Sequence, residues 1–321
     1  MKPKIFIDGD SGTTGLKIRQ RLMNRMDLEI LEIDREKRKD ADAKRKIYRQ
    51  ADLVILCLPD DAAKEAVRLC DNPKTKIIDC STAHRCASGW IYGLPEIFSA
   101  CGVAEKLRER IQAARLVANP GCYPTAFGAM VNPLSNLEII DYQTPIFCWA
   151  KTGYSGGGKK MIEEFESAGP EEAAEICCRT KNHNLNHRHL PEMKKHSFLE
   201  QEPLFFPTVA NFFQGMQVNV LISNPHLAFC TPEEIRTALA GFYATEKFIK
   251  VAGAAETEII GDGFLPPYAL NNTNFLEIFV FGTSGRINLV ARLDNLGKGS
   301  SGAAVQNMNL MLGLPETTGL L

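Results

Sequence analysis

Residues 5–15 read IFIDGDSGTTG, a short apolar run that is followed at once by a glycine-rich turn. Residues 5–7 predict a strand, and Ile18, Leu22 and Met26 recur after the turn at the spacing of one helix face. A strand, a glycine turn and a helix in this order are typical of the first unit of a dinucleotide-binding domain. The glycines let the backbone approach a pyrophosphate, which the positive end of the helix attracts.

The glycines follow a GxxGxxG spacing, one residue wider at the front than the usual dinucleotide fingerprint. An ordinary tight turn is the alternative interpretation. We expect the turn to contact a dinucleotide cofactor through Gly9, Ser11, Gly12, Thr13, Thr14 and Gly15.

The rest of the first 121 residues continues to alternate short strand-like and helix-like runs, which favours a parallel sheet. Further strands are predicted at Leu28–Ile33, Leu53–Leu58, Lys76–Asp79 and Arg115–Ala118. Asp60 and Asp61 lie at a predicted helix start, where the helix dipole favours acids. The predicted fold class is therefore α/β, beginning with a Rossmann domain.

After residue 122 the strands become longer, which predicts an α+β second domain with a mixed or antiparallel sheet and one or two helices. Its strands are expected at Gln143–Ala150, Gly215–Ile222, Leu276–Phe281 and Arg286–Leu293. Residues 300–312 predict one helix that packs back on the first domain. We therefore expect a dinucleotide-binding domain at 1–121 plus 297–321, and a catalytic and dimerisation domain at 122–296.

The 321-residue chain has 45% hydrophobic and 23% charged residues, which excludes a disordered chain. Its 37 basic and 38 acidic residues leave a net charge of −1, so no overall field attracts nucleic acid or an anionic membrane. The N-terminal apolar run is too short for a signal peptide, and no apolar stretch reaches the roughly 18 residues of a membrane span. Ten cysteines without a CxxC pair are too dilute for a disulfide scaffold. We expect a cytoplasmic protein with reduced thiols and no nucleic-acid or membrane partner.

The end of the second predicted strand carries information on the cofactor. Asp34 ends that strand, and an acid there commonly binds the ribose 2′-hydroxyl of NAD. The cations that follow, Arg35, Lys37, Arg38 and Lys39, favour the 2′-phosphate of NADP instead. A solvated helix face is the alternative explanation for such a run of charges. We predict NADP(H) as the cofactor, with Arg35 and Lys37 among its contacts.

A second strand-to-helix junction lies at residues 119–125, NPGCYPT. The predicted strand runs into a Pro-Gly turn, and a helix is expected to begin near Pro124. Cys122 is thereby placed near unpaired backbone N–H groups at the positive end of a helix dipole, which lowers a thiol pKa and provides an oxyanion pocket. Cys122 is therefore a candidate nucleophile. A buried structural cysteine is the alternative.

His183, His187 and His189 lie close together, downstream of Cys177 and Cys178. Their spacing, CC-x4-H-x3-H-x-H, matches no zinc motif, and we expect no metal. A histidine that acts as acid or base for a distant cysteine is the better interpretation, because such pairs are adjacent in space rather than in sequence.

Residues 153–160, GYSGGGKK, nearly spell a P-loop, but Lys160 stands where a magnesium-binding Ser or Thr belongs. We therefore predict a flexible loop near a phosphorylated substrate rather than an NTPase site.

These features together resemble the N-acetyl-gamma-glutamyl-phosphate reductases, specifically their shorter second type, within the semialdehyde dehydrogenase superfamily. The matching segments, in the expected order over nearly the whole chain, are GDSGTTG, ADLVILCLPDDAA, IIDCSTAHR, YGLPEI, ANPGCYPTA, TGYSGGGK, HRHLPEM and DNLGKGSSGAAVQNMNLMLGLPE. The resemblance implies a Rossmann domain followed by an α+β domain like that of aspartate-semialdehyde and glyceraldehyde-phosphate dehydrogenases, in a homo-oligomer. One departure is Asp10, since the family's longer type commonly reads GASG and an acid beside a pyrophosphate is unfavourable unless it points away.

By the same resemblance, Cys122 is the nucleophile and His189 the acid/base, and Asn295 is expected to contact the cofactor. The residues expected at the substrate are Arg85, Asn119, Ser155, Gly156, His187, Arg188 and Glu192. The implied reaction is the NADPH-dependent reduction of an acyl phosphate, N-acetylglutamyl phosphate, to its semialdehyde through a Cys122 thioester. The alternatives are a reductase of aspartyl phosphate or of a carrier-linked aminoadipyl phosphate, and a regulator that binds NADP without turnover.

Overall fold

The structure, a computed structural model, describes residues 2–98, 107–223, 230–261 and 263–321. The chain forms two compact units. The first comprises Met1–Pro95, Leu107–Gly121 and Ser300–Leu321, and the second comprises Glu96–Lys106 and Cys122–Gly299. The division expected from the sequence differs at residues 96–106 and 297–299, which it assigned to the first domain. Lys298 and Glu96 form a fully buried ion pair within the second unit, 2.6 Å from nitrogen to oxygen.

The first unit is built on a six-stranded sheet with the order β2-β1-β3-β4-β6-β5, in which every described pairing is parallel. Its strands are β1 (Lys4–Asp8), β2 (Glu29–Leu31), β3 (Leu53–Leu56), β4 (Lys76–Asp79), β5 (Ile91–Tyr92) and β6 (Leu116–Ala118). The predicted α/β class and Rossmann-type sheet are confirmed. Because the strand order reverses at β1, the carboxyl ends of β1 and β3 flank the crevice where such sheets bind ligands.

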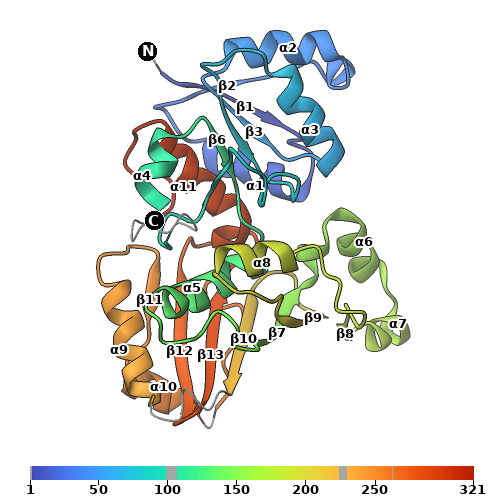
Figure 1. Cartoon of the computed structure of the whole chain (residues 1–321). Coiled ribbons are helices and arrows are strands. Elements are labelled where there is room, and N and C mark those ends of the chain that lie inside the picture. The colour runs from blue at the N-terminus through green and yellow to red at the C-terminus, as the bar shows by residue number, and fades with distance from the viewer. Residues whose placement is uncertain (1, 99–106, 224–229, 262) are drawn as a thin grey trace. The chain divides into compact units, whose positions relative to one another are not determined.

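Both faces of this sheet are buried, as expected for a parallel sheet. Helices α2 (Ala41–Gln50) and α3 (Asp60–Leu69) pack on the face that carries Phe6, Val54 and Ile77 (Figure 1). The alternate positions Ile5, Ile55 and Ile78 are buried on the other face. The remaining helices are α1 (Thr13–Leu22), α4 (Leu107–Ala113) and α11 (Gly302–Met311), and α11 contacts α1, α4 and β4. The C-terminal helix therefore packs on the first unit, as the sequence predicts.

Two local predictions for this unit are wrong. Helix α1 ends at Leu22, so that Met26 is 80% exposed instead of continuing the buried helix face. Strand β2 ends at Leu31, and Asp34 is therefore not the acid at its end. The helix predicted at residues 300–312 is present as α11, and a π-helical turn over Gly297–Ser301 runs directly into it.

The second unit contains a seven-stranded sheet with the order β11-β12-β13-β10-β7-β9-β8. Its strands are β7 (Phe147–Gly153), β8 (Cys178–Thr180), β9 (Leu204–Ala210), β10 (Met216–Ser223), β11 (Ile249–Val251), β12 (Leu276–Thr283) and β13 (Arg286–Leu293). The β7–β9 and β11–β12 pairs are parallel and the other described pairs are antiparallel, so the sheet is mixed.

More helices accompany this sheet than the one or two that the sequence predicts. They are α5 (Cys122–Asn136), α6 (Lys159–Ser167), α7 (Pro170–Glu175), α8 (Leu190–His196), α9 (Pro232–Phe242) and α10 (Ala254–Gly261). Helix α5 is mostly apolar and is buried over residues 123–134, where it contacts β10, β13, α8 and α9. Helix α9 begins with a capping box formed by Thr231 and Glu234. Within the described ranges, no helix is long and apolar enough to cross a membrane.

Candidate active site

The glycine turn joins β1 to α1 at the carboxyl edge of the parallel sheet. Gly9 has a φ of +89°, and a Cβ there would lie 2.3 Å from the Cys57 carbonyl oxygen. A Cβ at Gly15 would lie 2.4 Å from the Gly9 carbonyl oxygen. Both positions therefore require glycine. Gly12 caps α1 and Thr13 is its first residue, so the turn leads directly into a helix N-terminus.

A cavity of about 920 Å³ lies beside this turn, along the carboxyl ends of β1, β2 and β3. Gly9, Ser11 and Arg35, which the sequence predicts as cofactor contacts, all line it. Lys37 lies outside it, with its side chain 64% exposed and paired with Asp34 at 3.4 Å. The volume is within the range of cofactor sites, and the place is the crevice where α/β sheets bind dinucleotides.

The cavity also has the charge that a phosphorylated cofactor needs. The cations that line it are Arg19, Arg35, Arg38, Lys39 and Lys44. Lys44 is paired with the buried Asp8 at 2.8 Å, whereas the Nε of Arg38 is buried and has no hydrogen-bond partner in the described part of the chain. An orphaned guanidinium donor in a cationic cavity fits an anionic ligand. The first unit can therefore hold NADP(H).

The first turn of α1 is also tied to the C-terminal segment. Thr14, a predicted cofactor contact, places its Oγ1 3.1 Å from the Ser300 Oγ. This hydrogen bond fixes the start of α1, at whose N-terminus phosphates bind.

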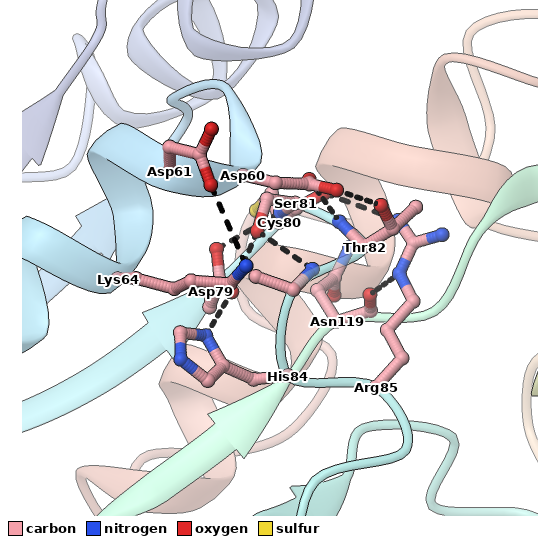
Figure 2. Close-up of polar contacts among 11 residues, drawn as sticks. Asp60, Asp61, Lys64, Asp79, Cys80, Ser81, Thr82, His84, Arg85 and Asn119 are labelled. Atoms are coloured by element: carbon pink, nitrogen blue, oxygen red, sulfur yellow. Dashed lines mark hydrogen bonds and ion pairs between the residues drawn. The ribbon is translucent and has the colours of Figure 1, made fainter. Parts of the chain in front are cut away.

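A second polar cluster lies at the carboxyl end of β4 (Figure 2). The buried carboxylate of Asp79 accepts hydrogen bonds from the Ser81 backbone N–H at 2.9 Å and hydroxyl at 2.8 Å, and lies 2.6 Å from Nδ1 of His84. The Asp60 carboxylate at the start of α3 accepts from the backbone N–H of Thr82 at 2.9 Å and from its hydroxyl. These bonds fix the segment that contains Arg85.

Arg85 and Asn119, both predicted substrate contacts, are buried and bonded to each other (Figure 2). Arg85 Nε donates to the Asn119 carbonyl oxygen at 3.0 Å, and its Nη2 donates to the Cys80 carbonyl oxygen at 3.1 Å. The Asn119 amide donates to the Ser300 carbonyl oxygen at 3.1 Å and accepts from Asn307 at 3.0 Å. These hydrogen bonds hold the C-terminal end of β6 in place.

Cys122 is the first residue of α5 in the second unit, two residues earlier than the predicted helix start, and it is partly exposed. Its position at the N-terminus of a 15-residue helix matches the elbow that the sequence predicts. The π-helix lies directly against it, because a Cβ at Gly299 would lie only 2.9 Å from the Cys122 Cβ. Tyr123 is buried beside it, and burial raises the pKa of that phenol.

The three candidate histidines lie in different surroundings. His183 is exposed, whereas His189 is buried and occupies the N-cap position of α8 without a side-chain capping bond. The ring of Tyr123 lies 5.9 Å from the ring of His189 and 5.9 Å from that of His187. His187 and His189 are in edge contact at 4.8 Å. Both therefore lie beside the start of α5, and His183 does not contribute to this ring cluster.

His187 is held in its neutral form. Burial lowers the pKa of its imidazole to about 4, and the nearby charges of Lys181 and Arg188 act in the same direction. Its Nδ1 accepts a hydrogen bond from the His189 backbone N–H at 3.2 Å, which an unprotonated nitrogen can do. Near neutral pH the His187 imidazole is therefore unprotonated and has no proton on Nδ1 to donate.

Sequence reasoning missed Lys181, which directly follows β8. Burial lowers the pKa of this amine, while the charge of Cys122 acts to raise it. Lys181 belongs to no motif, and only the pairing of β8 with β9 brings it beside the histidines. Arg188 is exposed, and Glu192 is buried in the first turn of α8.

The segment 153–160, which the sequence predicts to be a flexible loop, contains a 3-10 turn and the start of α6. Residues Tyr154–Gly157 form a 3-10 turn, and Ser155 is buried. Its hydroxyl accepts a hydrogen bond from the Asn295 amide at 3.0 Å, and the Asn295 carbonyl accepts from the Gly215 N–H at 2.8 Å. Gly156 lies beside the same amide. Asn295, a predicted cofactor contact, therefore organises this turn within the second unit.

Comparison with known proteins assigns the family. The family model "Semialdehyde dehydrogenase, NAD binding domain" matches residues 31–101, and "Semialdehyde dehydrogenase, dimerisation domain" matches residues 122–295. Among curated relatives, N-acetyl-gamma-glutamyl-phosphate reductase 2 of Nostoc sp. is 47% identical over 99% of both chains. The N-acetyl-gamma-glutamyl-phosphate reductase of Brucella anthropi is 45% identical over 98% of this chain and 99% of the relative.

Among solved structures, aspartate semialdehyde dehydrogenase II of Vibrio cholerae, complexed with ASA, has a TM-score of 0.72 at 14% identity, covering 98% of this chain and 99% of that one. Aspartate semialdehyde dehydrogenase of Francisella tularensis has a TM-score of 0.69 at 11% identity, covering 95% and 99%. At these identities the likeness establishes the fold alone, whereas the curated relatives match the sequence over almost its full length. The chain belongs to the semialdehyde dehydrogenase family and, within it, to the N-acetyl-gamma-glutamyl-phosphate reductases.

Proposed function

We propose that this protein reduces N-acetyl-gamma-glutamyl phosphate to N-acetylglutamate semialdehyde with NADPH and releases inorganic phosphate, a reaction of arginine biosynthesis. The observation that carries the proposal is the 47% identity, over 99% of both chains, to a relative that bears the name of this reaction. Cys122 at the start of α5 and the buried His189 supply the chemistry that the reaction requires.

Cys122 is the nucleophile in this proposal. Its sulfur forms a bond to the acyl carbon, the bond from that carbon to the phosphate oxygen breaks, and inorganic phosphate leaves with the bonding electrons. The product is a thioester on Cys122. A thiolate suits this role because it attacks readily and later leaves readily enough to expel an aldehyde. Backbone N–H groups at the start of α5 are suited to the developing oxyanion.

His189 is the acid/base. After reduction of the thioester carbon, the C–S bond breaks and the aldehyde is released. His189 transfers the proton between the substrate oxygen and the Cys122 sulfur in this step. A neutral imidazole near physiological pH can accept and return a proton. His187, with a pKa of about 4, stays uncharged at that pH and orients His189 through its backbone N–H.

The phosphate of the substrate calls for positive charge near Cys122. Lys181 and Arg188 supply it, since both lie close enough to His187 to lower its pKa. Ser155, Gly156 and Glu192 are further proposed substrate contacts. Arg85 and Asn119 hold the end of β6 in position, through hydrogen bonds that involve the carbonyl oxygens of Asn119, Cys80 and Ser300 and the amide of Asn307.

NADP(H) is held in this proposal by the glycine turn and by the cationic cavity of the first unit. When bound, it supplies the hydride that reduces the thioester. The chain's own contribution is to present backbone N–H groups to the pyrophosphate and guanidinium groups to the 2′-phosphate.

A homo-oligomer is also part of the proposal. One face of the second unit's sheet carries exposed apolar side chains: Phe147 of β7 lies between Leu221 of β10 and Leu204 of β9 in the pairing register, and Trp149 lies two residues further along β7. Exposed apolar patches of this kind are typical of subunit interfaces.

We also propose that the reaction takes place in the cytoplasm. The described cysteines, none of which is in a disulfide, agree with a reducing compartment.

The reverse reaction gives the test. Purified protein should reduce NADP⁺ with N-acetylglutamate semialdehyde only when phosphate or its analogue arsenate is present, because only such an anion releases the acyl group from Cys122. Aspartate semialdehyde should be oxidised far more slowly. Equal rates with both aldehydes would contradict the proposed substrate, and binding of NADP⁺ without turnover of either would favour a regulator.

A further inference from the structure

A fully buried ion pair joins the π-helix beside Cys122 to the segment that follows β5. The Lys298 Nζ lies 2.6 Å from the Glu96 Oε1, and neither side chain has any exposed surface. The same ammonium group lies over the ring of the buried Phe248, 5.7 Å from its centroid. Lys298 directly precedes Gly299, the glycine that packs against Cys122. The pair therefore holds the part of the chain that lies beside the proposed nucleophile.

The carboxylate end of the pair is fixed to α5, the helix that begins with Cys122. Two residues after Glu96, the Phe98 backbone N–H donates to Asn132 Oδ1 at 3.0 Å, and its carbonyl oxygen accepts from the same amide group at 3.2 Å. Asn132 is a buried residue of α5, and it also donates to the His196 carbonyl oxygen of α8 at 2.9 Å. Glu96 is thereby held in place relative to the helix that carries Cys122.

A second connection runs from Glu96 to α5 through Tyr243. Burial raises the pKa of this phenol and the charge of Glu96 acts in the same direction, which places the two side chains near each other. The Tyr243 hydroxyl donates to the Ala129 carbonyl oxygen, in the middle of α5, at 2.7 Å. The Glu96 carboxylate thus lies between groups bonded to α5 and the ammonium group of the π-helix.

Stability alone does not account for this ion pair. Taking two charges out of water is costly, and replacing a buried pair by apolar residues of similar volume is often neutral or stabilising. A charged pair instead imposes one geometry, because its ammonium and carboxylate must meet at hydrogen-bond distance. The π-helix needs such a constraint, since a Cβ added at Gly299 would already lie 2.9 Å from the Cys122 Cβ. Turns of this kind are rare and are frequently found at functional sites.

We propose that Lys298 and Glu96 are positioning residues for Cys122. Their ion pair sets the distance between the π-helix and α5, and with it the space that Gly299 leaves for the thiol. Loss of the pair would let the π-helix shift, so that the sulfur is misplaced relative to the acyl carbon and the space beside it widens. This role rests on the proposed function of Cys122 as the nucleophile, and it acts on that residue only through Gly299.

The test replaces the pair by apolar side chains of similar size, Glu96→Leu together with Lys298→Met, so that no unpaired charge is left buried. The melting temperature should change little. The kcat of the proposed reaction should fall roughly 10- to 100-fold, because small misplacements of reacting groups have effects of this size, while the KM for the semialdehyde and the affinity for NADP⁺ stay near the parent values.

The matched control is Glu277→Leu together with Arg292→Met. This variant removes the 2.6 Å ion pair between the neighbouring strands β12 and β13, whose side chains are also largely buried. It should retain the kcat of the parent protein, since neither residue connects the π-helix to α5.

A second measurement needs no turnover and reports the space beside the thiol. Peptide mass spectrometry gives the rates at which Cys122 is alkylated by iodoacetamide and by the bulkier N-phenylmaleimide. Because Gly299 lies against Cys122, loss of the ion pair should raise the rate for the bulky reagent several-fold relative to the small one. A pair that only stabilises the fold would leave this ratio unchanged.

Glu96→Gln keeps the shape of the side chain and removes its charge, and it should change kcat and the alkylation ratio in the same direction by smaller factors. It provides the test if the double variant does not fold. A folded variant with the parent's kcat or the parent's ratio would overturn the inference. Absence of reductase activity in the parent protein would instead contradict the proposed function, while the alkylation ratio would still show whether the pair positions Cys122.

Discussion

Cys122 differs from the buried thiols of the chain by its partial exposure at a helix N-terminus. Burial raises the pKa of Cys70 and of Cys148, which makes these thiols poor nucleophiles. We expect limiting iodoacetamide to abolish activity in step with labelling of Cys122, measured by peptide mass spectrometry, and substrate to protect it. Cys122→Ser should lose almost all turnover and still bind NADPH. Near-normal activity of that variant would exclude covalent catalysis at this position.

A second prediction at this scale concerns His189. Replacing it by Asn should lower kcat roughly 10²- to 10⁴-fold, because a general acid/base contributes about that much, and should leave NADPH affinity unchanged. His183→Asn is the matched control, since His183 lies in the same segment and is exposed. A mild effect at His189 combined with a severe one at His183 would show that the acid/base has been assigned to the wrong histidine.

His187 predicts a pH dependence of stability. Its pKa of about 4 in the folded chain lies below the ordinary value of 6.5, so the unfolded chain binds the proton more tightly. The folded state should therefore lose stability as the pH falls from about 6.5 towards 4. His187→Asn removes this group, and its melting temperature should fall less than that of the parent between pH 7 and pH 4.5. Parallel curves for the two proteins would contradict the assignment.

Among the elements, the π-helix over Gly297–Ser301 determines where Cys122 can lie. A methyl group at Gly299 would be 2.9 Å from the Cys122 Cβ, so that Gly299→Ala must displace the nucleophile or the π-helix. We expect kcat to fall on the order of 10²-fold, since small misplacements of reacting groups have effects of this size, while NADPH binding changes little. Gly241→Ala on α9 is the control, because a Cβ there meets nothing within 4 Å. Equal kcat values for the two variants would show that the contact is unimportant.

For the whole molecule, the open sheet face of the second unit is the feature that bears on assembly. Trp149 and Phe147 are 41% and 49% exposed, and both lie on this face. Trp149→Glu should dissociate the proposed homo-oligomer because a charge placed in an apolar interface is costly. Sedimentation velocity measures the change. Phe264→Glu, at another exposed aromatic residue, should leave the assembly intact. A monomeric parent protein would contradict the proposal.

Much of the fold could be read from local patterns. The predicted strand Lys76–Asp79 coincides with β4 and Arg286–Leu293 coincides with β13, because continuous or alternating apolar runs between turn residues are local signals. The glycine turn and the elbow at Cys122 were likewise predictable, because each is set by glycine or proline residues within a few positions of it. Glycine permits the turn's backbone conformation and close approach, and proline favours the first turn of a helix. The ends of the elements were predicted less accurately. The strand predicted at Leu28–Ile33 ends at Leu31, because its pairing with β1 stops there.

Contacts between distant residues could not be predicted, because they depend on which side chains the folded chain brings together. No pattern along the chain links Arg38 to Asp10 or Asn307 to Asn119, which lie 28 and 188 positions apart. The run of cations after β2 indicated a phosphate, but only the tertiary structure distinguishes Arg38 in the cavity from Lys37 in solvent. The sequence by itself therefore determines the features that depend on residue type and local geometry, such as the glycine turn and the cysteine at the start of α5. Which of the four neighbouring cations line the cavity is decided by packing, which sets burial and pairing for each side chain separately: Arg35, Arg38 and Lys39 line it and Lys37 does not.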